Sequence, residues 1–135
     1  MIFVDTGYLI ALLDRSDQHH AVARAWTSIL TQDMVTTSFV LTEYFNYFSA
    51  GSLRIPTHRL HDLLISKPEF ESVVVDPSLY DRGLALHRAR PDKHWSLTDC
   101  ISFTVMTERN ITQALAYDHH FEQAGFEALL RRDPP

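Results

Sequence analysis

The sequence predicts a three-layer α/β/α sandwich around a mainly parallel, five-stranded sheet. Short apolar or β-branched runs alternate with longer segments whose apolar residues recur every three or four positions, an order typical of helix-covered parallel sheets. The composition is that of an ordinary globular domain, with 45% hydrophobic and 21% charged residues among 135, and 4 Gly and 6 Pro. We therefore expect a single domain over residues 1–135.

The first element expected is a strand over residues 2–4, a β-friendly run that Asp5 ends. The apolar residues 8–13 then suit a helix. From His20 onward a single apolar stripe predicts a second helix packed on a surface. The residues of this stripe are Val22, Ala25, Trp26, Ile29 and Leu30.

The same order repeats in the middle of the chain. Residues 34–37 form a β-branched run, and Ser38 is expected to cap a helix that stops near Gly51. Residues 60–65 suggest another short helix. The clearest buried strand is expected at the three valines of residues 73–75.

The remaining segments predict two helices and two strands. Residues 79–89 suit a helix, and a second helix is expected from Ser96 to about residue 110. This second helix is apolar nearly all round, so we expect it to be buried between neighbours. Strands are expected over residues 113–117 and 126–130.

Charge and cysteine content exclude several classes of protein. Seventeen acidic and twelve basic residues give a net charge of -5, so the chain as a whole is not a basic nucleic-acid-binding protein. The single Cys100 excludes an intrachain disulfide and a cysteine-based zinc cluster. No apolar run reaches the ~18 residues that span a bilayer, and Asp5 interrupts the position of a signal peptide. A cytoplasmic protein with no membrane association is expected.

Four acidic residues are candidate ligands of a divalent cation. Asp5 follows the first strand and Asp118 follows the strand expected to end at Tyr117, so both should lie where α/β folds bind ligands. Asp99 lies in the first turn of the buried helix, and Glu43 lies among aromatic residues inside the helix after the second strand. Clustered carboxylates repel unless a cation offsets their charge, and all-oxygen ligands favour Mg²⁺ or Mn²⁺. The hydroxyls expected nearby are those of Thr6 and Thr98.

Three of these acids also have a structural explanation. Asp5 and Asp118 could each cap the following helix or turn, and Asp99 lies three residues after Ser96, the spacing of a capping box. Capping is the better explanation for each acid alone. Glu43 has no capping partner at the required spacing and could instead face solvent, whereas one metal cluster explains all four acids together.

A basic segment precedes the Asp99 helix. Residues 82–94 hold four Arg or Lys residues against the single acid Asp92. Such a segment is a candidate surface for nucleic-acid phosphates, although scattered arginines on a helix are more often only solvated. The candidate substrate contacts are Arg82, Arg88, Arg90, Lys93, His94 and Trp95.

Several stretches of the sequence resemble the PIN-domain ribonucleases, and among them the VapC toxins of prokaryotic toxin–antitoxin pairs. They are the opening IFVDTGYLIALLD with DQHHAVARAW after it, then TSFVLTEYFNYF, HWSLTDCISFTVM and AYDHHFEQAGF. The resemblance covers nearly the whole chain and is most specific at HWSLTDCISF. It places the acidic quartet on Asp5, Glu43, Asp99 and Asp118, and the hydroxyls on Thr6 and Thr98. It implies a five-stranded α/β sandwich, Mg²⁺- or Mn²⁺-dependent endonucleolytic cleavage of RNA, and inhibition by a cognate antitoxin.

Two features near the last acid bear on the metal. Ala116 stands where many PIN relatives carry Thr, so one polar contact near the metal is missing. The adjacent His119 and His120 resemble transition-metal ligands, but neighbouring residues rarely both face one ion. Structural or substrate-side roles are expected for them.

Two other functions stay open. A degenerate domain could use the aromatic helix around Glu43 only to bind a protein partner. A phosphatase could use Asp5 as its nucleophile, but such sites place a lysine against the phosphoryl group, and neither Lys67 nor Lys93 follows a strand. The apolar helices near residues 8 and 38 also suggest a homodimer or an antitoxin groove.

Overall fold

The computed structural model describes residues 1–135 and confirms the predicted fold class. Five strands form one sheet in the order β3-β2-β1-β4-β5, and every neighbouring pair is parallel. Because the strands are parallel, their carboxyl ends lie along one edge of the sheet. The strands are β1 (Ile2–Val4), β2 (Met34–Thr37), β3 (Phe70–Val73), β4 (Gln113–Leu115) and β5 (Glu127–Ala128).

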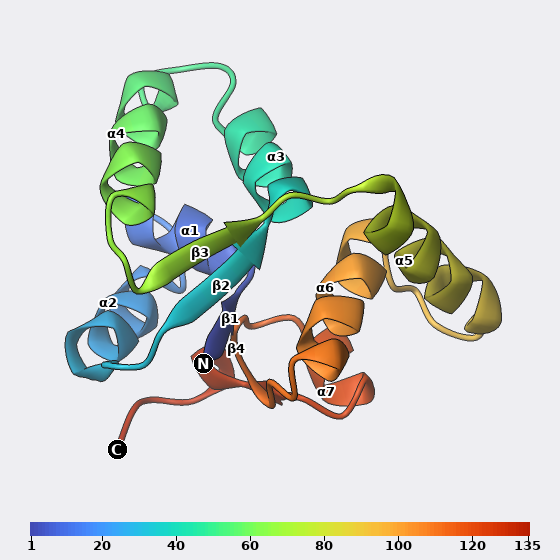
Figure 1. Cartoon of the computed structure of the whole chain (residues 1–135). Coiled ribbons are helices and arrows are strands. Elements are labelled where there is room, and N and C mark those ends of the chain that lie inside the picture. Colours follow the sequence, from blue (N-terminus) through green and yellow to red (C-terminus); the bar gives the residue numbers. More distant parts are fainter.

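Helices cover both faces of the sheet, as Figure 1 shows. On one side lie α1 (Thr6–Leu13), α2 (His20–Ile29) and α4 (Arg54–Ile65), with α3 (Ser38–Tyr47) packed against α1. On the other side lie α5 (Pro77–Ala89), α6 (Leu97–Glu108) and α7 (His119–Gln123), and a 3-10 turn follows at Leu129–Arg131. None of these helices is long and apolar enough to cross a membrane.

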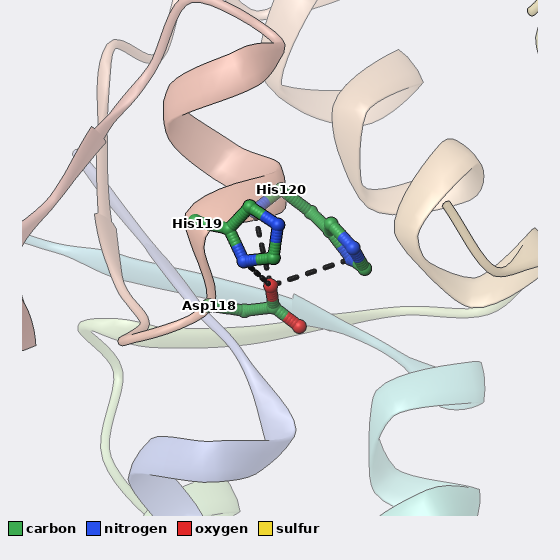
Figure 2. Close-up of side chains that lie close together, drawn as sticks. All are labelled: Asp118, His119 and His120. Carbon is green, nitrogen blue, oxygen red and sulfur yellow. Dashed lines mark hydrogen bonds and ion pairs between the residues drawn. The ribbon is translucent and has the colours of Figure 1, made fainter. Parts of the chain in front are cut away.

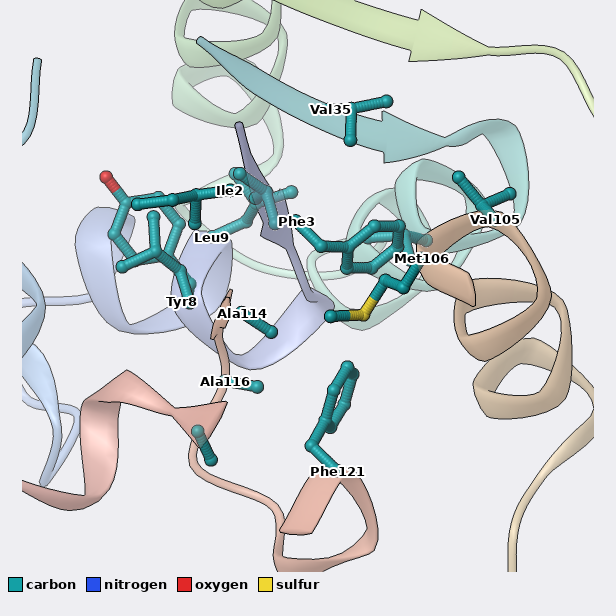
Figure 3. Packing of buried hydrophobic residues seen from close by; sticks show 14 of the residues in the cluster. Ile2, Phe3, Tyr8, Leu9, Val35, Val105, Met106, Ala114, Ala116 and Phe121 are labelled. Atoms are coloured by element: carbon teal, nitrogen blue, oxygen red, sulfur yellow. The ribbon is translucent and has the colours of Figure 1, made fainter. Parts of the chain in front are cut away.

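The core lies on both sides of the central strand β1. Successive side chains of a strand point to opposite faces, so Ile2 lies near Leu9 of α1 while Phe3 lies near Met106 of α6 (Figure 3). Phe3 also packs against Phe121 of α7, with ring centroids 6.4 Å apart. The prediction that the helix after Ser96 is buried is confirmed, since six residues of α6 are buried.

Strand β3 lies earlier in the sequence than the predicted strand over residues 73–75. Its register pairs Phe70 with Met34 and Val73 with Thr37, where β2 ends, so Val74 has no strand beside it and is 75% exposed. The predicted position was wrong because the length of β2, rather than the run of valines, sets the limits of the pairing.

The cap of α3 also differs from the prediction. Thr37 occupies the N-cap position, and its hydroxyl accepts a hydrogen bond from the backbone N–H of Val40 at 3.3 Å. The Ser38 hydroxyl instead accepts from the backbone N–H of Val75 at 2.9 Å. Ser38 therefore ties the chain after β3 to the start of α3.

The two C-terminal strands are shorter than predicted. Strand β4 ends at Leu115, and β5 pairs with it only through residues 127 and 128 before the chain turns. The segment after β4 is therefore free of the sheet ladder and lies beyond its carboxyl edge. The short helix α7, which the sequence indicated only as a turn, begins directly after Asp118.

Candidate metal centre

The four predicted acids meet in one cleft at the carboxyl edge of the sheet. Strands β1 and β4 are neighbours, and the backbone N–H of Asp5 donates to the carbonyl of Leu115 at 3.2 Å. This contact brings the loops after the two strands together. The cleft has a volume of about 310 Å³ and is lined by Asp5, Thr6, Gly7, Ile10, Glu43, His94, Ser96, Asp99, Tyr117, Asp118 and His120.

Asp5 does not act as a helix cap. It occupies the N-cap position of α1, but its side chain makes no capping hydrogen bond. Burial, and after it the charge of Asp99, raise the pKa of the Asp5 carboxyl to about 8, with smaller effects from Glu43 and Asp118. The structural alternative for Asp5 is therefore not supported. The hydrogen bond from the Thr6 backbone lowers the pKa of the Asp5 carboxyl but does not outweigh burial and the neighbouring acids.

Asp99 is both a capping residue and part of the cleft. Its backbone N–H donates to the Ser96 hydroxyl at 3.0 Å, and its Oδ2 accepts from the Ser96 backbone N–H at 3.1 Å, completing a capping box. Burial raises the pKa of the Asp99 carboxyl, and the hydrogen bonds from Ser96 and His120 act in the opposite direction. The capping box fixes the carboxylate at the start of α6, with its side chain only 14% exposed.

His120 links Asp99 to Asp118. Its Nδ1 lies 3.1 Å from Asp99 Oδ2 and 3.3 Å from Asp118 Oδ1, and its backbone N–H donates to Asp118 Oδ1 at 3.0 Å. Asp118 is thereby the N-cap of α7. Figure 2 shows the imidazoles of His119 and His120 next to each other, both close to the Asp118 carboxylate. Both approach the same oxygen, which suits positioning of that carboxylate.

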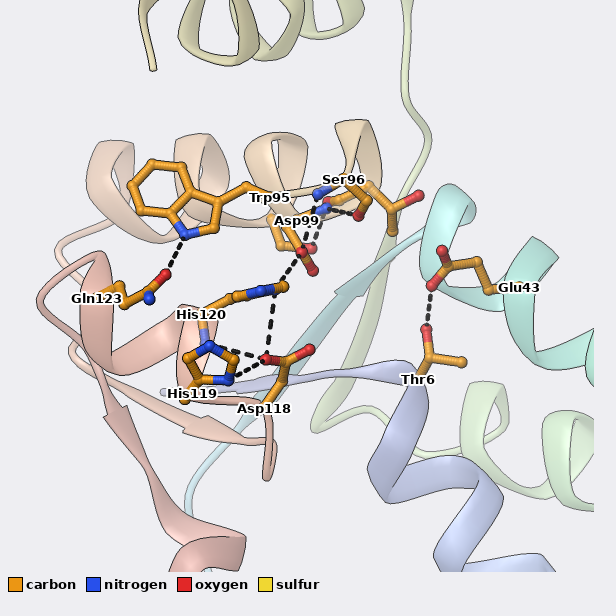
Figure 4. Close-up of polar contacts among 11 residues, drawn as sticks. Thr6, Glu43, Trp95, Ser96, Asp99, Asp118, His119, His120 and Gln123 are labelled. Atoms are coloured by element: carbon orange, nitrogen blue, oxygen red, sulfur yellow. Dashed lines mark hydrogen bonds and ion pairs between the residues drawn. The ribbon is translucent and has the colours of Figure 1, made fainter. Parts of the chain in front are cut away.

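Glu43 reaches the cleft from α3. Its Oε1 accepts a hydrogen bond from the Thr6 hydroxyl at 2.7 Å, and Figure 4 shows this pair facing Asp99 and Asp118 across the cleft. Thr6 is the first residue of α1, so the contact fixes Glu43 relative to Asp5. Thr98, the other candidate hydroxyl, does not line the cleft, and its carbonyl accepts a hydrogen bond from Ser102 at 3.0 Å.

The donor set fits a hard divalent cation. Four carboxylates from four different segments line the cleft, with a hydroxyl at Thr6 and no lysine or arginine to neutralise them. Carboxylate oxygens suit Mg²⁺ or Mn²⁺, and an ion would offset the charges of the neighbouring acids that, after burial, raise the pKa of Asp5.

Two arginines of the basic segment already form ion pairs with acidic residues of the chain. Arg82 donates to both oxygens of Glu108 at 2.7 and 3.1 Å, on the side of α5 that meets α6. Arg90 binds both oxygens of Asp92 at 3.0 Å. Neither residue lines the cleft, and nor do Arg88 and Lys93. Their positions give no support for direct contact with a substrate in the cleft.

The loop residues His94 and Trp95 differ in position. His94 lines the cleft. Trp95 is a core residue at 5% exposure, its indole N–H donates to Gln123 at 3.1 Å, and its ring packs edge-on against Phe103. A buried indole cannot contact substrate, so the role suggested for Trp95 is corrected to a structural one.

Sequence reasoning did not single out Gly7, Ile10 and Tyr117 as cleft residues. Tyr117 was expected to continue β4, but that strand ends at Leu115, and the ring instead lies on the cleft rim. The one signal in the sequence that could have identified Tyr117 as a cleft residue was its position directly before Asp118.

The PIN domain family model matches residues 2–127 of the chain. The chain belongs to the PIN domain family. It is 26% identical over 136 aligned residues to the "23S rRNA-specific endonuclease VapC20" of Mycobacterium tuberculosis, covering 93% of this chain and 95% of that protein. The resemblance found in the sequence motifs is thereby confirmed.

Solved structures give the same picture for this PIN domain. The crystal structure of M. tuberculosis VapC20, described as a Sarcin-Ricin loop cleaving toxin, superposes with a TM-score of 0.83 at 25% identity, covering 93% of this chain and 96% of that one. FitAcB from Neisseria gonorrhoeae superposes with a TM-score of 0.65 at 18% identity, covering 95% of each chain, and this match shows the fold alone.

Proposed function

We propose that this PIN domain is a metal-dependent endoribonuclease and the toxin of a toxin–antitoxin pair. The observation that carries the proposal is the convergence of Asp5, Glu43, Asp99 and Asp118 in one cleft that holds no lysine or arginine. The similarity to an endonuclease named for 23S rRNA supports RNA as the substrate class. The products would carry 5′-phosphate and 3′-hydroxyl ends.

In this proposal Asp5, Asp99 and Asp118 hold the principal Mg²⁺ or Mn²⁺, and Glu43 binds or orients a second ion or the attacking water. A bound ion would lower the pKa of water and offset negative charge on the phosphoryl oxygens. The remaining contacts set the geometry of the acids. Thr6 orients Glu43, Ser96 orients Asp99, and His120 holds Asp99 and Asp118 together.

The proposal includes a cognate antitoxin and a homodimer, in the cytoplasm. Three large apolar side chains of α4 are exposed, and exposed apolar surface on one helix supports a protein-binding role for it. They are Ile55, Leu63 and Ile65, at 67%, 56% and 48% exposure.

The two alternative functions have less support. A phosphatase using Asp5 would need a lysine against its phosphoryl group, and the cleft has none. A domain that only binds a protein partner would not need to bury Asp5 among three further acids, an arrangement that raises the pKa of the Asp5 carboxyl.

The test is cleavage of a mixed pool of structured RNAs by the full chain with Mg²⁺, Mn²⁺ or EDTA, followed by sequencing of the fragment ends. Asp5→Asn and Asp99→Asn remove ligand charge and scarcely change side-chain volume, so both should lose metal-dependent cleavage. Asp81→Asn changes an exposed acid on α5 and serves as the matched control. Full activity in both cleft variants would contradict the assignment of the acids, and absence of cleavage by the unmodified chain would contradict the function.

A further inference from the structure

An aromatic pair lies on the rim of the acidic cleft. The rings of Tyr117 and His19 are stacked, with centroids 4.0 Å apart and planes inclined by 19°. Tyr117 lines the cleft directly beside Asp118, and His19 comes from the turn before α2. The pair thus places the start of α2 beside the segment that carries Asp118.

Both members of the pair are fixed at their backbones. The carbonyl of Tyr117 accepts a hydrogen bond from Arg131 at 3.0 Å, and the backbone N–H of His19 donates to Asp17 at 2.8 Å. The Tyr117 ring lies so close to Gly7 that a Cβ there would stand 2.5 Å from its Cε1. The ring therefore has a defined place before any ligand binds.

Packing in the hydrophobic core does not explain the position of the Tyr117 ring. The hydroxyls of the buried Tyr8 and Tyr44 each lie 2.8 Å from an oxygen of a threonine, Thr27 and Thr57 respectively. Tyr117, in contrast, is 37% exposed at the cleft. An exposed, preorganised aromatic ring beside a cleft for a phosphodiester has the form of a stacking platform for a base.

Because the cleft is lined by four acids, a stacking platform is important for binding a nucleotide there. No lysine or arginine lines the cleft, so a nucleotide there has no side-chain cation to hold its phosphate. Stacking on aromatic rings is the contact that binds unpaired bases without regard to sequence. RNA exposes such bases in loops, bulges and ends.

We propose that Tyr117, supported by His19, stacks on an unpaired base of the RNA nucleotide bound in the cleft. This inference rests on the proposed nuclease function and adds to it a side chain that binds the base of the nucleotide in the cleft. Tyr117 is a substrate-binding residue in this assignment, and His19 is a positioning residue that holds the ring.

The test compares two probes that differ only in the base, adenosine 5′-monophosphate and ribose 5-phosphate. Each is titrated into the full chain with Mg²⁺, and its dissociation constant is measured by isothermal titration calorimetry. Stacking should make the nucleotide bind about 5- to 140-fold more tightly than the sugar phosphate. Tyr117→Ala should abolish that ratio, Tyr117→Phe should keep it, and His19→Ala should reduce it.

Tyr80→Ala is the matched control, because Tyr80 is 38% exposed on α5 and packs against Phe39 outside the cleft. This variant should leave the ratio unchanged. A ratio near one for the unmodified chain, or an unchanged ratio in Tyr117→Ala, would overturn the inference. An unfolded variant would lose affinity for both probes, so Tyr117→Ala must keep its affinity for ribose 5-phosphate while losing the extra affinity for the nucleotide. Failure of RNA cleavage is scored separately in the nuclease assay, so the two proposals fail by different measurements.

Discussion

At the scale of single residues, Asp5 determines the electrostatics of the cleft. Its carboxyl takes no capping hydrogen bond, and burial with three nearby acids raises its pKa from 3.8 to about 8. Without a cation, Asp5 therefore keeps its proton at neutral pH. A cation that binds here must displace that proton, so metal affinity and the protonation of Asp5 are coupled.

This coupling predicts a pH-dependent stability of the metal-free protein. A carboxyl whose pKa is raised on folding stabilises the fold fully below pH 4, and the contribution is lost as the pH rises toward 8. In EDTA the unmodified chain should lose up to about 1.4 kcal/mol per pH unit from this group. Asp5→Asn should show a flatter dependence between pH 5 and 8, measured by urea unfolding at each pH. Parallel profiles for the two proteins would contradict the raised pKa.

The same coupling predicts that cation binding strengthens with pH. Since one proton leaves Asp5 for each ion bound, Mg²⁺ affinity should rise up to about tenfold per pH unit below pH 8. Thermal shifts over a Mg²⁺ titration at pH 6 and 7.5 measure this, because a ligand stabilises the fold according to its saturation. Asp99→Asn, which removes a proposed ligand, should lose most of the shift at both pH values. Equal affinity of the unmodified chain at the two pH values would show that no proton is displaced.

At the scale of elements, α6 is held in position by close packing on α5. Gly83 is buried at this contact, and a Cβ there would lie 2.4 Å from Cγ1 of Ile101 and 3.2 Å from its Cα. The backbones approach closely because the residue has no side chain. Since α6 begins with Ser96 and carries Asp99, this contact also sets the position of one cleft acid.

Gly83→Ala should therefore destabilise the protein, although alanine is the better helix former by about 1 kcal/mol. Both the Ile101 side chain and the α6 backbone would have to shift, and overpacking of this kind costs about 1–3 kcal/mol. Chemical denaturation measures the change. Asp81→Ala, an exposed substitution in the same helix, should stay within about 0.5 kcal/mol of the unmodified chain. A stabilised Gly83→Ala would show that the helices can separate without cost.

The elements also show which features a sequence can predict. Asp5 was placed correctly because local pattern fixes the end of β1 and parallel topology fixes where strand ends meet. The limits of β3 and the burial of Trp95 depend on partners far along the chain, Thr37 for β3 and Gln123 for Trp95. Periodicity within one segment contains no information on such partners.

At the scale of the whole molecule, the distribution of charge limits how RNA can bind. The net charge is -5, and five arginines form ion pairs with acidic residues. They are Arg82, Arg90, Arg109, Arg131 and Arg132, paired with Glu108, Asp92, Glu71, Glu122 and Glu127. With no lysine or arginine in the cleft, few phosphates can be neutralised by side chains there.

RNA binding by this PIN domain should therefore depend only weakly on monovalent salt. For single strands the logarithm of affinity falls with the logarithm of salt concentration with a slope of about -0.7 per phosphate neutralised. Two contacts would reduce affinity by less than about tenfold between 50 and 200 mM salt, whereas six to ten contacts would reduce it by about 300- to 20,000-fold. The measurement is the KM for a cleaved RNA across this range of salt concentration at saturating Mg²⁺. The Arg88→Ala variant tests whether the unpaired arginine of α5 contributes to RNA binding. A KM that rises more than about 100-fold would mean that a basic surface outside the cleft holds the RNA, whereas a shallow slope leaves the metal and the aromatic rim as the main contacts.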